Sequence, residues 1–501
     1  MGGNYSYLPS EPASNNFFCI TFRVPDSIKV IDCDPPTLEI VRKAIARGYR
    51  LGLRQEYDKY GSRTFVLAGN PFKVGCSKEE AIAGKQVACT LLQDLAHKGW
   101  QVLNSSELCR NKDLSSWFFE RTNEACVNYD STVCCIALSG FDKFQLVNFP
   151  KQLLAKVADA VRRTWTLGIQ EEMKDAYGSM EMKMNGNPWS ASERGAVEAR
   201  RMILEIIRAM ASEGYVLCMS TSIKDTTDSL FFRSATAADQ PSCSELGSPD
   251  ASFVLSLNRH DRLRLIEAPS EAQEVVRNVL LHHWTSGLTG DRDYHGSREF
   301  KLGGSPWWTE GAESVRTRLL ITLLLQELRD KGWRLVQTIE LCRRLNDKSV
   351  FVFARAQPES SLHWCLSLHS KSVLRFVNAP VEVVDALRLV IAGNYIHGIK
   401  TERVFAGYHQ VRLRGRPWSS HNGNDHVHGR HMMLGILEAM QQRGWSLVCS
   451  ADVSAIYHHA DSGQDYPVDV HSLWFGAINK KPPIADGAVG VGGASSAPSC
   501  E

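Results

Sequence analysis

Alternating apolar and polar positions predict strands in residues 251–356, and apolar positions three and four apart predict helices between them. The first two strands alternate on either side of Asp261, which predicts an opening hairpin. Pro269-Ser270-Glu271 is a suitable start for a helix. The predicted elements are, in order, strands at Phe253–Asn258 and Arg262–Glu267, a helix at Ser270–Trp284, a strand at Arg298–Leu302, a helix at Glu310–Asp330, and strands at Arg334–Thr338 and Ser349–Ala354.

This order, β-β-α-β-α-β-β, predicts an α+β domain with a mainly antiparallel sheet and both helices on one face. The third strand favours a sheet that is apolar on one side, because Phe300 and Leu302 flank Lys301 at period two. The run Arg412, Arg414 and Arg416 extends this outer face as a basic stripe. We interpret it as a solvated face, with an anion site as the alternative.

The same pattern recurs four times along the chain. A Pro-aromatic pair marks each copy, and a Gly-aromatic pair closes its second helix, as expected for a glycine that ends a helix. These pairs are Pro71-Phe72, Pro188-Trp189, Pro306-Trp307 and Pro417-Trp418, followed by Gly99-Trp100, Gly214-Tyr215, Gly332-Trp333 and Gly444-Trp445. The chain is therefore predicted to hold four tandem domains.

The repeats also set the expected boundaries. A leader with a myristoylation motif covers residues 1–16, and the repeats cover residues 17–125, 131–234, 251–356 and 361–479. The stretch from Ser234 to Asp250 is polar and is interpreted as a linker. Repeat 4 carries an insertion of about a dozen residues between Trp445 and Phe475. Residues 480–501 are rich in Gly, Ala, Ser and Pro and are expected to be a disordered tail.

Composition narrows the class of protein. The net charge of the 501 residues is only +2, which gives no field for gathering nucleic acid, so no nucleic-acid partner is expected. The fourteen cysteines form no CxxC pair, and we interpret them as reduced, mostly buried thiols of an intracellular protein. No apolar run is long enough to span a membrane, so any membrane contact is expected to be peripheral.

Opposite charges recur in each copy. Another glycine recurs in each copy, at Gly52, Gly168, Gly287 and Gly398, and an acid stands four residues after it. A base stands fifteen residues before the aromatic residue of each Gly-aromatic pair. We predict structural ion pairs between them, with a catalytic pair as the alternative. The predicted pairs are Glu56 with Lys85, Glu172 with Arg200, Asp291 with Arg318, and Glu402 with Arg430.

Other candidate sites are weaker. The Pro-aromatic and Gly-aromatic side chains are expected in the core, with a ligand-stacking platform as the alternative. His428 and His431 stand three apart in a histidine-rich stretch and are the candidates for zinc, but a polar loop leading into a helix is the simpler interpretation. No nucleotide or hydrolase motif fits a strand-to-helix context, and no cofactor is predicted.

The N-terminus carries the most specific signal. Met1-Gly2-Gly3-Asn4-Tyr5-Ser6 fits the motif in which Gly2 is myristoylated, the alternative being an unmodified flexible leader. One myristoyl chain binds membranes only marginally, and no basic cluster lies between Gly2 and Phe17. Membrane attachment is therefore expected to be reversible.

The third copy carries a resemblance to a known family. Its residues Asp261 to Ile266, Tyr294-His295-Gly296, Glu299 to Leu302 and Pro306-Trp307-Trp308 resemble repeats in uncharacterised proteins of fungi and invertebrates. Some of those proteins carry a Mediator-subunit label. The resemblance implies the tandem-repeat architecture and supplies no activity or functional residue.

We therefore expect a non-enzymatic, cytoplasmic scaffold that offers surfaces to protein partners and associates reversibly with membranes. The second hypothesis is a protein that binds a small molecule or lipid in clefts between repeats. The third is an enzyme, which would require a cleft in one copy lined by converging titratable groups.

Overall fold

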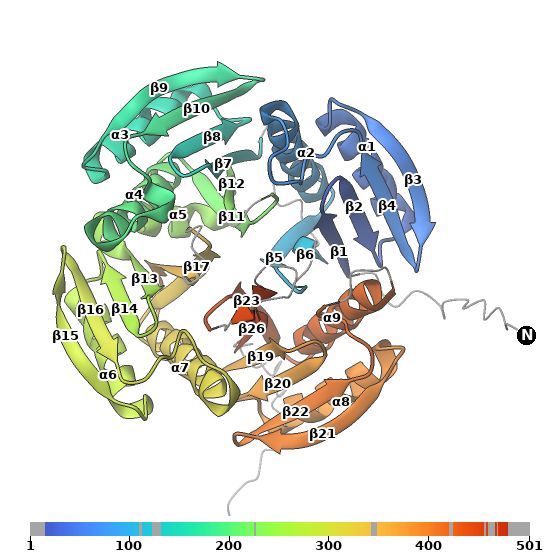
Figure 1. Cartoon of the computed structure of the whole chain (residues 1–501), viewed down its shortest axis with the longest axis vertical. Helices are drawn as coiled ribbons and strands as arrows, with labels where there is room; N and C mark the ends of the chain where they lie inside the picture. Colours follow the sequence, from blue (N-terminus) through green and yellow to red (C-terminus); the bar gives the residue numbers. More distant parts are fainter. Residues whose placement is uncertain are drawn as a thin grey trace, which may run out of the picture.

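Four six-stranded sheets surround a common centre in the computed structural model (Figure 1). The structure describes residues 16–109, 113–122, 132–224, 227–341, 348–419, 424–454, 457–458, 466–467 and 469–478. Each sheet belongs to one repeat, and its strands follow one another from the outer rim of the ring to its centre. The fold is α+β and consists of four tandem domains, as the sequence predicts.

Repeat 1 shows the architecture of each copy. Its sheet has the order β3-β4-β2-β1-β6-β5, and all neighbouring strands pair antiparallel. Strand β3 lies at the rim and β5 at the centre (Figure 1). The elements are β1 (Phe17–Arg23), β2 (Ser27–Ile31), α1 (Pro35–Gly48), β3 (Leu53–Lys59), β4 (Ser62–Leu67), α2 (Lys78–Ala96), β5 (Trp100–Ser106) and β6 (Asp113–Arg121).

The other three repeats follow the same order. Repeat 2 comprises β7 (Cys134–Ser139), β8 (Lys143–Val147), η1 (Lys151–Leu153), α3 (Leu154–Thr164), β9 (Ile169–Ala176), β10 (Ser179–Met184), η2 (Pro188–Ser190), α4 (Glu193–Ser212), β11 (Tyr215–Thr221) and β12 (Ser229–Ser234). Repeat 3 comprises β13 (Ser252–Asn258), β14 (Arg262–Ile266), α6 (Ser270–His283), β15 (Leu288–Tyr294), β16 (Ser297–Leu302), α7 (Gly311–Asp330), β17 (Trp333–Ile339) and β18 (Val350–Arg355). Repeat 4 comprises β19 (His363–His369), β20 (Val373–Val377), α8 (Val381–Asn394), β21 (Ile399–Phe405), β22 (Tyr408–Leu413), α9 (Asn424–Gln442), β23 (Trp445–Ala451) and β26 (Asp469–Ala477), with β24 (Tyr457–His458) and β25 (Tyr466–Pro467) in the insertion.

Each repeat contains one strand more than the sequence pattern predicts. The extra strand is the rim strand, β3 in repeat 1, whose residues are mostly exposed and polar and therefore give no alternating signal. It joins β4 through a tight turn in which Tyr60 and Gly61 have φ of 54° and 75°. Two successive positive φ values suit the turns that connect hairpins. The observed order is β-β-α-β-β-α-β-β.

The stretch predicted as a linker is ordered. Residues 237–251 form η3 (Ala237–Asp239), α5 (Gln240–Gly247) and η4 (Pro249–Ala251), and α5 packs against α4. Cys243 and Leu246 are buried. This part of the linker interpretation was wrong, because two apolar side chains among polar residues are enough to dock one short helix.

The longer helix of each repeat lies between two sheets. Helix α2 packs on its own sheet and against β7 and β8 of repeat 2, and α4 and α7 repeat this relation with the next copies. Helix α9 of repeat 4 packs against β1 and β2 of repeat 1, which closes the ring (Figure 1). The array is therefore circular, and no repeat is left as a free end.

Ring closure buries both faces of the central part of each sheet. In β7, Cys134 contributes to the core of repeat 2, whereas its neighbour Cys135 contributes to the core shared with repeat 1. In β1, the residues from Phe17 to Phe22 are all buried. The expectation of a sheet with one solvated face holds only near the rim, where Lys301 and Arg412 are exposed.

Candidate functional site

The four predicted bases sit in the interfaces between repeats. Each is at most 6% exposed, and each bonds to the backbone carbonyl one helical turn earlier and to a polar side chain of the next repeat. The contacts across the interfaces are Lys85 Nζ to Gln145 Oε1 at 3.2 Å, Arg200 Nε to Ser256 Oγ at 2.6 Å, Arg318 Nε to Ser472 Oγ at 2.9 Å, and Arg430 Nε to Ser116 Oγ at 3.2 Å. We call these four contacts the interface clasps.

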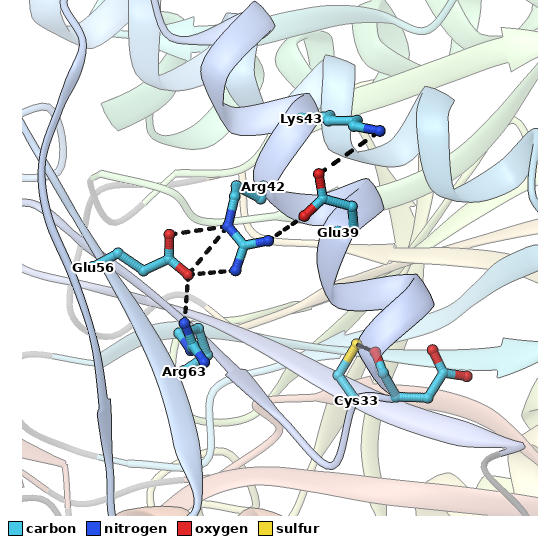
Figure 2. Close-up of polar contacts among 7 residues, drawn as sticks. Cys33, Glu39, Arg42, Lys43, Glu56 and Arg63 are labelled. Atoms are coloured by element: carbon cyan, nitrogen blue, oxygen red, sulfur yellow. Dashed lines mark hydrogen bonds and ion pairs between the residues drawn. The ribbon is translucent and has the colours of Figure 1, made fainter.

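The predicted acids lie elsewhere, near the rim. Glu56 in β3 binds Arg42 of α1, with Arg42 Nη2 to Glu56 Oε1 at 2.7 Å, and also Arg63 of β4 (Figure 2). The hydrogen bond from Arg42 is the main reason why the pKa of Glu56 lies below its ordinary value. Figure 2 also shows Glu39 between Arg42 and Lys43 on the same helix.

The acids of the other three copies also pair within their own repeat. Among the described contacts, the acids pair with an arginine of the first helix and not with the predicted base of the second. These pairs are Glu172 with Arg162, Asp291 with Arg277, and Glu402 with Arg388. The predicted pairings with Lys85, Arg200, Arg318 and Arg430 were wrong, because the bases face the next repeat while the acids face the first helix of their own repeat.

A second set of contacts links the repeats at the centre of the ring. There, a residue of one repeat donates to a backbone carbonyl of the next. The contacts are Ser115 Oγ to Ser222 O at 2.8 Å, Asp228 N to Glu340 O at 2.9 Å, Ser349 N to Asp452 O at 3.0 Å, and His471 N to Glu107 O at 3.2 Å. We call this set the central clasps. They pass around the ring in one direction and close on repeat 1.

Two carboxyl groups at the centre of the ring, those of Asp228 and Glu340, have raised pKa values. Asp228 accepts hydrogen bonds from Ser220 Oγ at 2.7 Å and from Glu340 N at 2.8 Å. Burial raises its pKa to about 6. Burial, with the nearby Asp452 and Asp228, also raises the pKa of Glu340, whose carboxyl contacts the Ser349 hydroxyl.

His471 is the imidazole of this cluster. Burial lowers its pKa to about 4, so the ring is neutral near pH 7. Its Nδ1 accepts the Glu107 N–H at 3.4 Å and lies 3.1 Å from Ser450 Oγ, which itself donates to Ser106 Oγ at 2.7 Å. The space between these groups measures about 10 Å³, which has room for about one water molecule and for no organic substrate. The cluster therefore serves as a hydrogen-bonding hub between repeats.

A larger cavity lies toward the first residues of the inner strands. It measures about 230 Å³ and is lined by residues of all four repeats. Its walls include Leu103 of β5, Cys218 of β11, Val336 of β17 and Val448 of β23. Gln101, which is exposed, lies at its edge, so the cavity reaches the surface.

The predicted aromatic and histidine candidates lie in the cores or contact other side chains. The Pro-aromatic side chains Phe72, Trp189, Trp307 and Trp418 are buried in the cores, which favours packing over ligand stacking. His431 lies on α9, where it pairs with Asp32 of repeat 1, and this pairing raises its pKa. His428 packs edge-on against His397, and burial lowers its pKa. No three potential metal ligands gather among the described residues. Gly2 lies outside the described residues.

The sequence interpretation missed the central clasps. One signal was present: a hydroxyl residue stands five positions after each Gly-aromatic aromatic, at Ser105, Ser220, Thr338 and Ser450. The clasp residues themselves are not the same in all copies: the equivalent position is serine in repeats 1 and 3, at Ser115 and Ser349, but Asp228 in repeat 2 and His471 in repeat 4. A search for identical residues in all copies cannot find such a position.

Comparison with known proteins places the chain in a family. A family model for a single domain matches residues 16–120, 132–233, 251–354 and 363–475. These matches span most of the chain, so the protein belongs to the family built from tandem copies of this domain. A search of curated proteins gives no significant match. No helix in the described part of the chain has the length and apolar character needed to cross a membrane.

Removing an interface clasp should destabilise the ring. Arg430→Met leaves the Ser116 hydroxyl and the His426 carbonyl without this buried donor. We expect a loss of about 3 kcal/mol in the free energy of unfolding, measured by urea denaturation. Arg412→Met, at an exposed position, is the matched control and should change the value by less than about 0.5 kcal/mol. Equal effects of the two substitutions would contradict the clasp.

Replacing the buried Asp228 should change how stability depends on pH. Its pKa in the folded chain is about 6 against an ordinary value of 3.8, so the stability tied to the protonated carboxyl is present below pH 4 and is lost as the pH rises through 6. Asp228→Asn mimics the protonated form and should be more stable than the parent by up to about 3 kcal/mol at pH 8. The two proteins should converge at pH 4.

The measurement is urea denaturation at several pH values between 4 and 8. Asp293→Asn makes the same change at a carboxyl that is 89% exposed and serves as the control. A constant difference between Asp228→Asn and the parent at all pH values would show that the carboxyl does not titrate as inferred.

Proposed function

We propose that this protein is a non-enzymatic, cytoplasmic scaffold, a closed ring that offers surfaces to protein partners and associates reversibly with membranes through a myristoylated Gly2. The rigid ring supports the scaffold part of the proposal, because each repeat is held by both neighbours and its rim remains exposed. The resemblance to proteins of fungi and invertebrates adds no activity to this proposal.

The observation that carries the proposal is a set of three strongly exposed apolar side chains on repeat 4. Leu389 of α8, Ile396 of the following turn and Val404 of β21 are 74%, 56% and 72% exposed. We call these three residues the repeat 4 surface. Large apolar side chains that stay in water and gather on one part of a protein commonly mark an interaction site.

The other repeats carry polar or charged residues at these positions. In register with Val404 stand Asp58, Lys174 and Asp293, and in register with Ile396 stand Arg50, Thr166 and Thr285. The residue after the rim-pairing arginine is Leu389 in repeat 4 but Lys43 in repeat 1 and Asn278 in repeat 3. The apolar surface is therefore a property of one repeat and not a requirement of the fold.

A second candidate function is the binding of a small molecule between repeats. It is favoured by the 230 Å³ cavity, which has walls from all four copies.

The first test concerns Gly2. The full chain and Gly2→Ala are expressed in a eukaryotic cell, weighed intact, and separated into membrane and cytosol fractions. We expect the mass of the parent to include a myristoyl group and its membrane fraction to fall several-fold in Gly2→Ala, since one acyl chain gives only marginal binding. An unmodified Gly2, or equal membrane fractions, would contradict membrane attachment through this residue.

The second test concerns the repeat 4 surface. Leu389→Lys with Val404→Asp installs the residue types of repeat 1, so the fold should be unaffected. Proteins crosslinked to the ring in cells should include a set that is lost with this variant. Lys43→Ala with Asp58→Ala in repeat 1 is the control and should retain the set. Identical crosslinked sets for the parent and both variants would contradict the repeat 4 surface as a docking site.

A further inference from the structure

One repeated backbone irregularity contributes a residue from every repeat to the walls of the 230 Å³ cavity. In each inner strand, pairing with its neighbour shifts by one residue, at Leu103, Cys218, Val336 and Val448. A β-bulge of this kind re-aims the side chain of the extra residue. All four bulge residues line the cavity, so every repeat contributes one apolar side chain or thiol to it.

One amide side chain in this cavity has no hydrogen-bond partner among the described residues. Asn104 follows the bulge in β5, is only 6% exposed and lines the cavity. No hydrogen bond joins its side chain to the residues that the structure describes, and its polar atoms are not fully enclosed, so they stay accessible from the cavity. Gln337 occupies the equivalent position in repeat 3 and also lines the cavity, with only its Oε1 engaged, by Thr338 N at 2.9 Å.

The ionisable side chains that line the cavity are either paired with an opposite charge or uncharged. Arg233 binds Asp239 through two hydrogen bonds of 2.7 and 3.1 Å, and Asp239 also accepts from Thr236. Burial raises the pKa of the Cys218 thiol to about 11, so it is uncharged near pH 7. A charged ligand would find no unpaired countercharge among the described lining residues, and an unpaired buried charge is costly.

The volume limits the size of a ligand. An apolar cavity of about 150 Å³ accepts benzene, with six carbon atoms. In proportion, 230 Å³ accepts about nine or ten non-hydrogen atoms. A fourteen-carbon myristoyl chain exceeds this size, so the cavity is not suited to hold the whole acyl group of the leader.

We infer that the cavity at the centre of the ring is a binding site for a small uncharged molecule with an apolar body and one amide or carbonyl group. The apolar body packs between Leu103, Val336 and Val448, and the polar group bonds to the free amide of Asn104. The inference deepens the second candidate function and is independent of Gly2 and of the repeat 4 surface.

The test uses three probes of similar size and different chemistry. Benzamide carries the amide, benzoate replaces it by a charge, and ethylbenzene has neither. Binding is measured by ligand-observed NMR and calorimetry on the purified full-length Gly2→Ala protein, so that the result does not depend on acylation. We expect saturable one-site binding of benzamide and at least tenfold weaker binding of benzoate.

Two variants locate the site. Asn104→Leu keeps the size of the side chain and removes the amide, and should weaken benzamide about fivefold while leaving ethylbenzene unchanged. Val336→Phe fills the cavity and should abolish binding of both. Val404→Phe, the same enlargement at the rim, is the control and should bind like the parent.

Several outcomes would overturn the inference. These are absence of saturable benzamide binding, equal affinity for benzoate, an affinity for benzamide that Asn104→Leu leaves unchanged, and binding that persists in Val336→Phe. Circular dichroism of each variant shows whether it is folded. Because the protein is unacylated and the repeat 4 surface is intact, failure here leaves the scaffold proposal standing.

Discussion

The ring depends on one arrangement, a helix held between two sheets. The longer helix of each repeat covers its own sheet with one side and the next sheet with the other, and a buried base on that helix bonds across the interface. Burying a cation is costly unless its donors are matched, so the side-chain oxygens of Gln145, Ser256, Ser472 and Ser116 that receive it fix the position of the neighbour. Without its neighbour, each repeat would expose the apolar residues on one face of its sheet. The four repeats therefore pack into one body and are not independent domains.

The sequence predicted the copies, their α+β class and their buried aromatic residues, because these recur in every copy. It did not predict the rim strand, since an exposed edge strand needs hydrogen bonds from β4 and no apolar side chains. It also paired Glu56 with the wrong base. An acid and a base recur at the positions of Glu56 and Lys85, but they do not contact each other. Glu56 forms an ion pair with Arg42 of its own repeat, whereas Lys85 bonds to Gln145 of the next repeat. A sequence read one repeat at a time cannot distinguish these two environments.

The four copies share their core and their interface clasps, but they differ at the central clasps and on the rim. The central clasps use Ser115, Asp228, Ser349 and His471 at one equivalent position. On the rim, repeat 4 exposes the apolar Leu389 and Val404 where repeat 1 has Lys43 and Asp58. Each interface at the centre therefore has its own set of hydrogen-bonding groups. Repeat 4 therefore presents a different surface from the other repeats. The proposed docking site depends on this difference, and the proposed ligand site depends on Asn104, which only repeat 1 supplies to the cavity among the described residues.

Ring closure also has a consequence for biosynthesis. Ser116 and its partner Arg430 are separated by 314 residues, so the sheet face of repeat 1 that α9 covers is made long before its cover. At ordinary translation rates the delay is roughly 15 to 60 seconds. During that time Phe17 and Phe118, which pack into the shared core with repeat 4, lack their contacts with that repeat. A nascent chain of this kind is a natural client for a chaperone that shields apolar surface on the ribosome until the last repeat emerges.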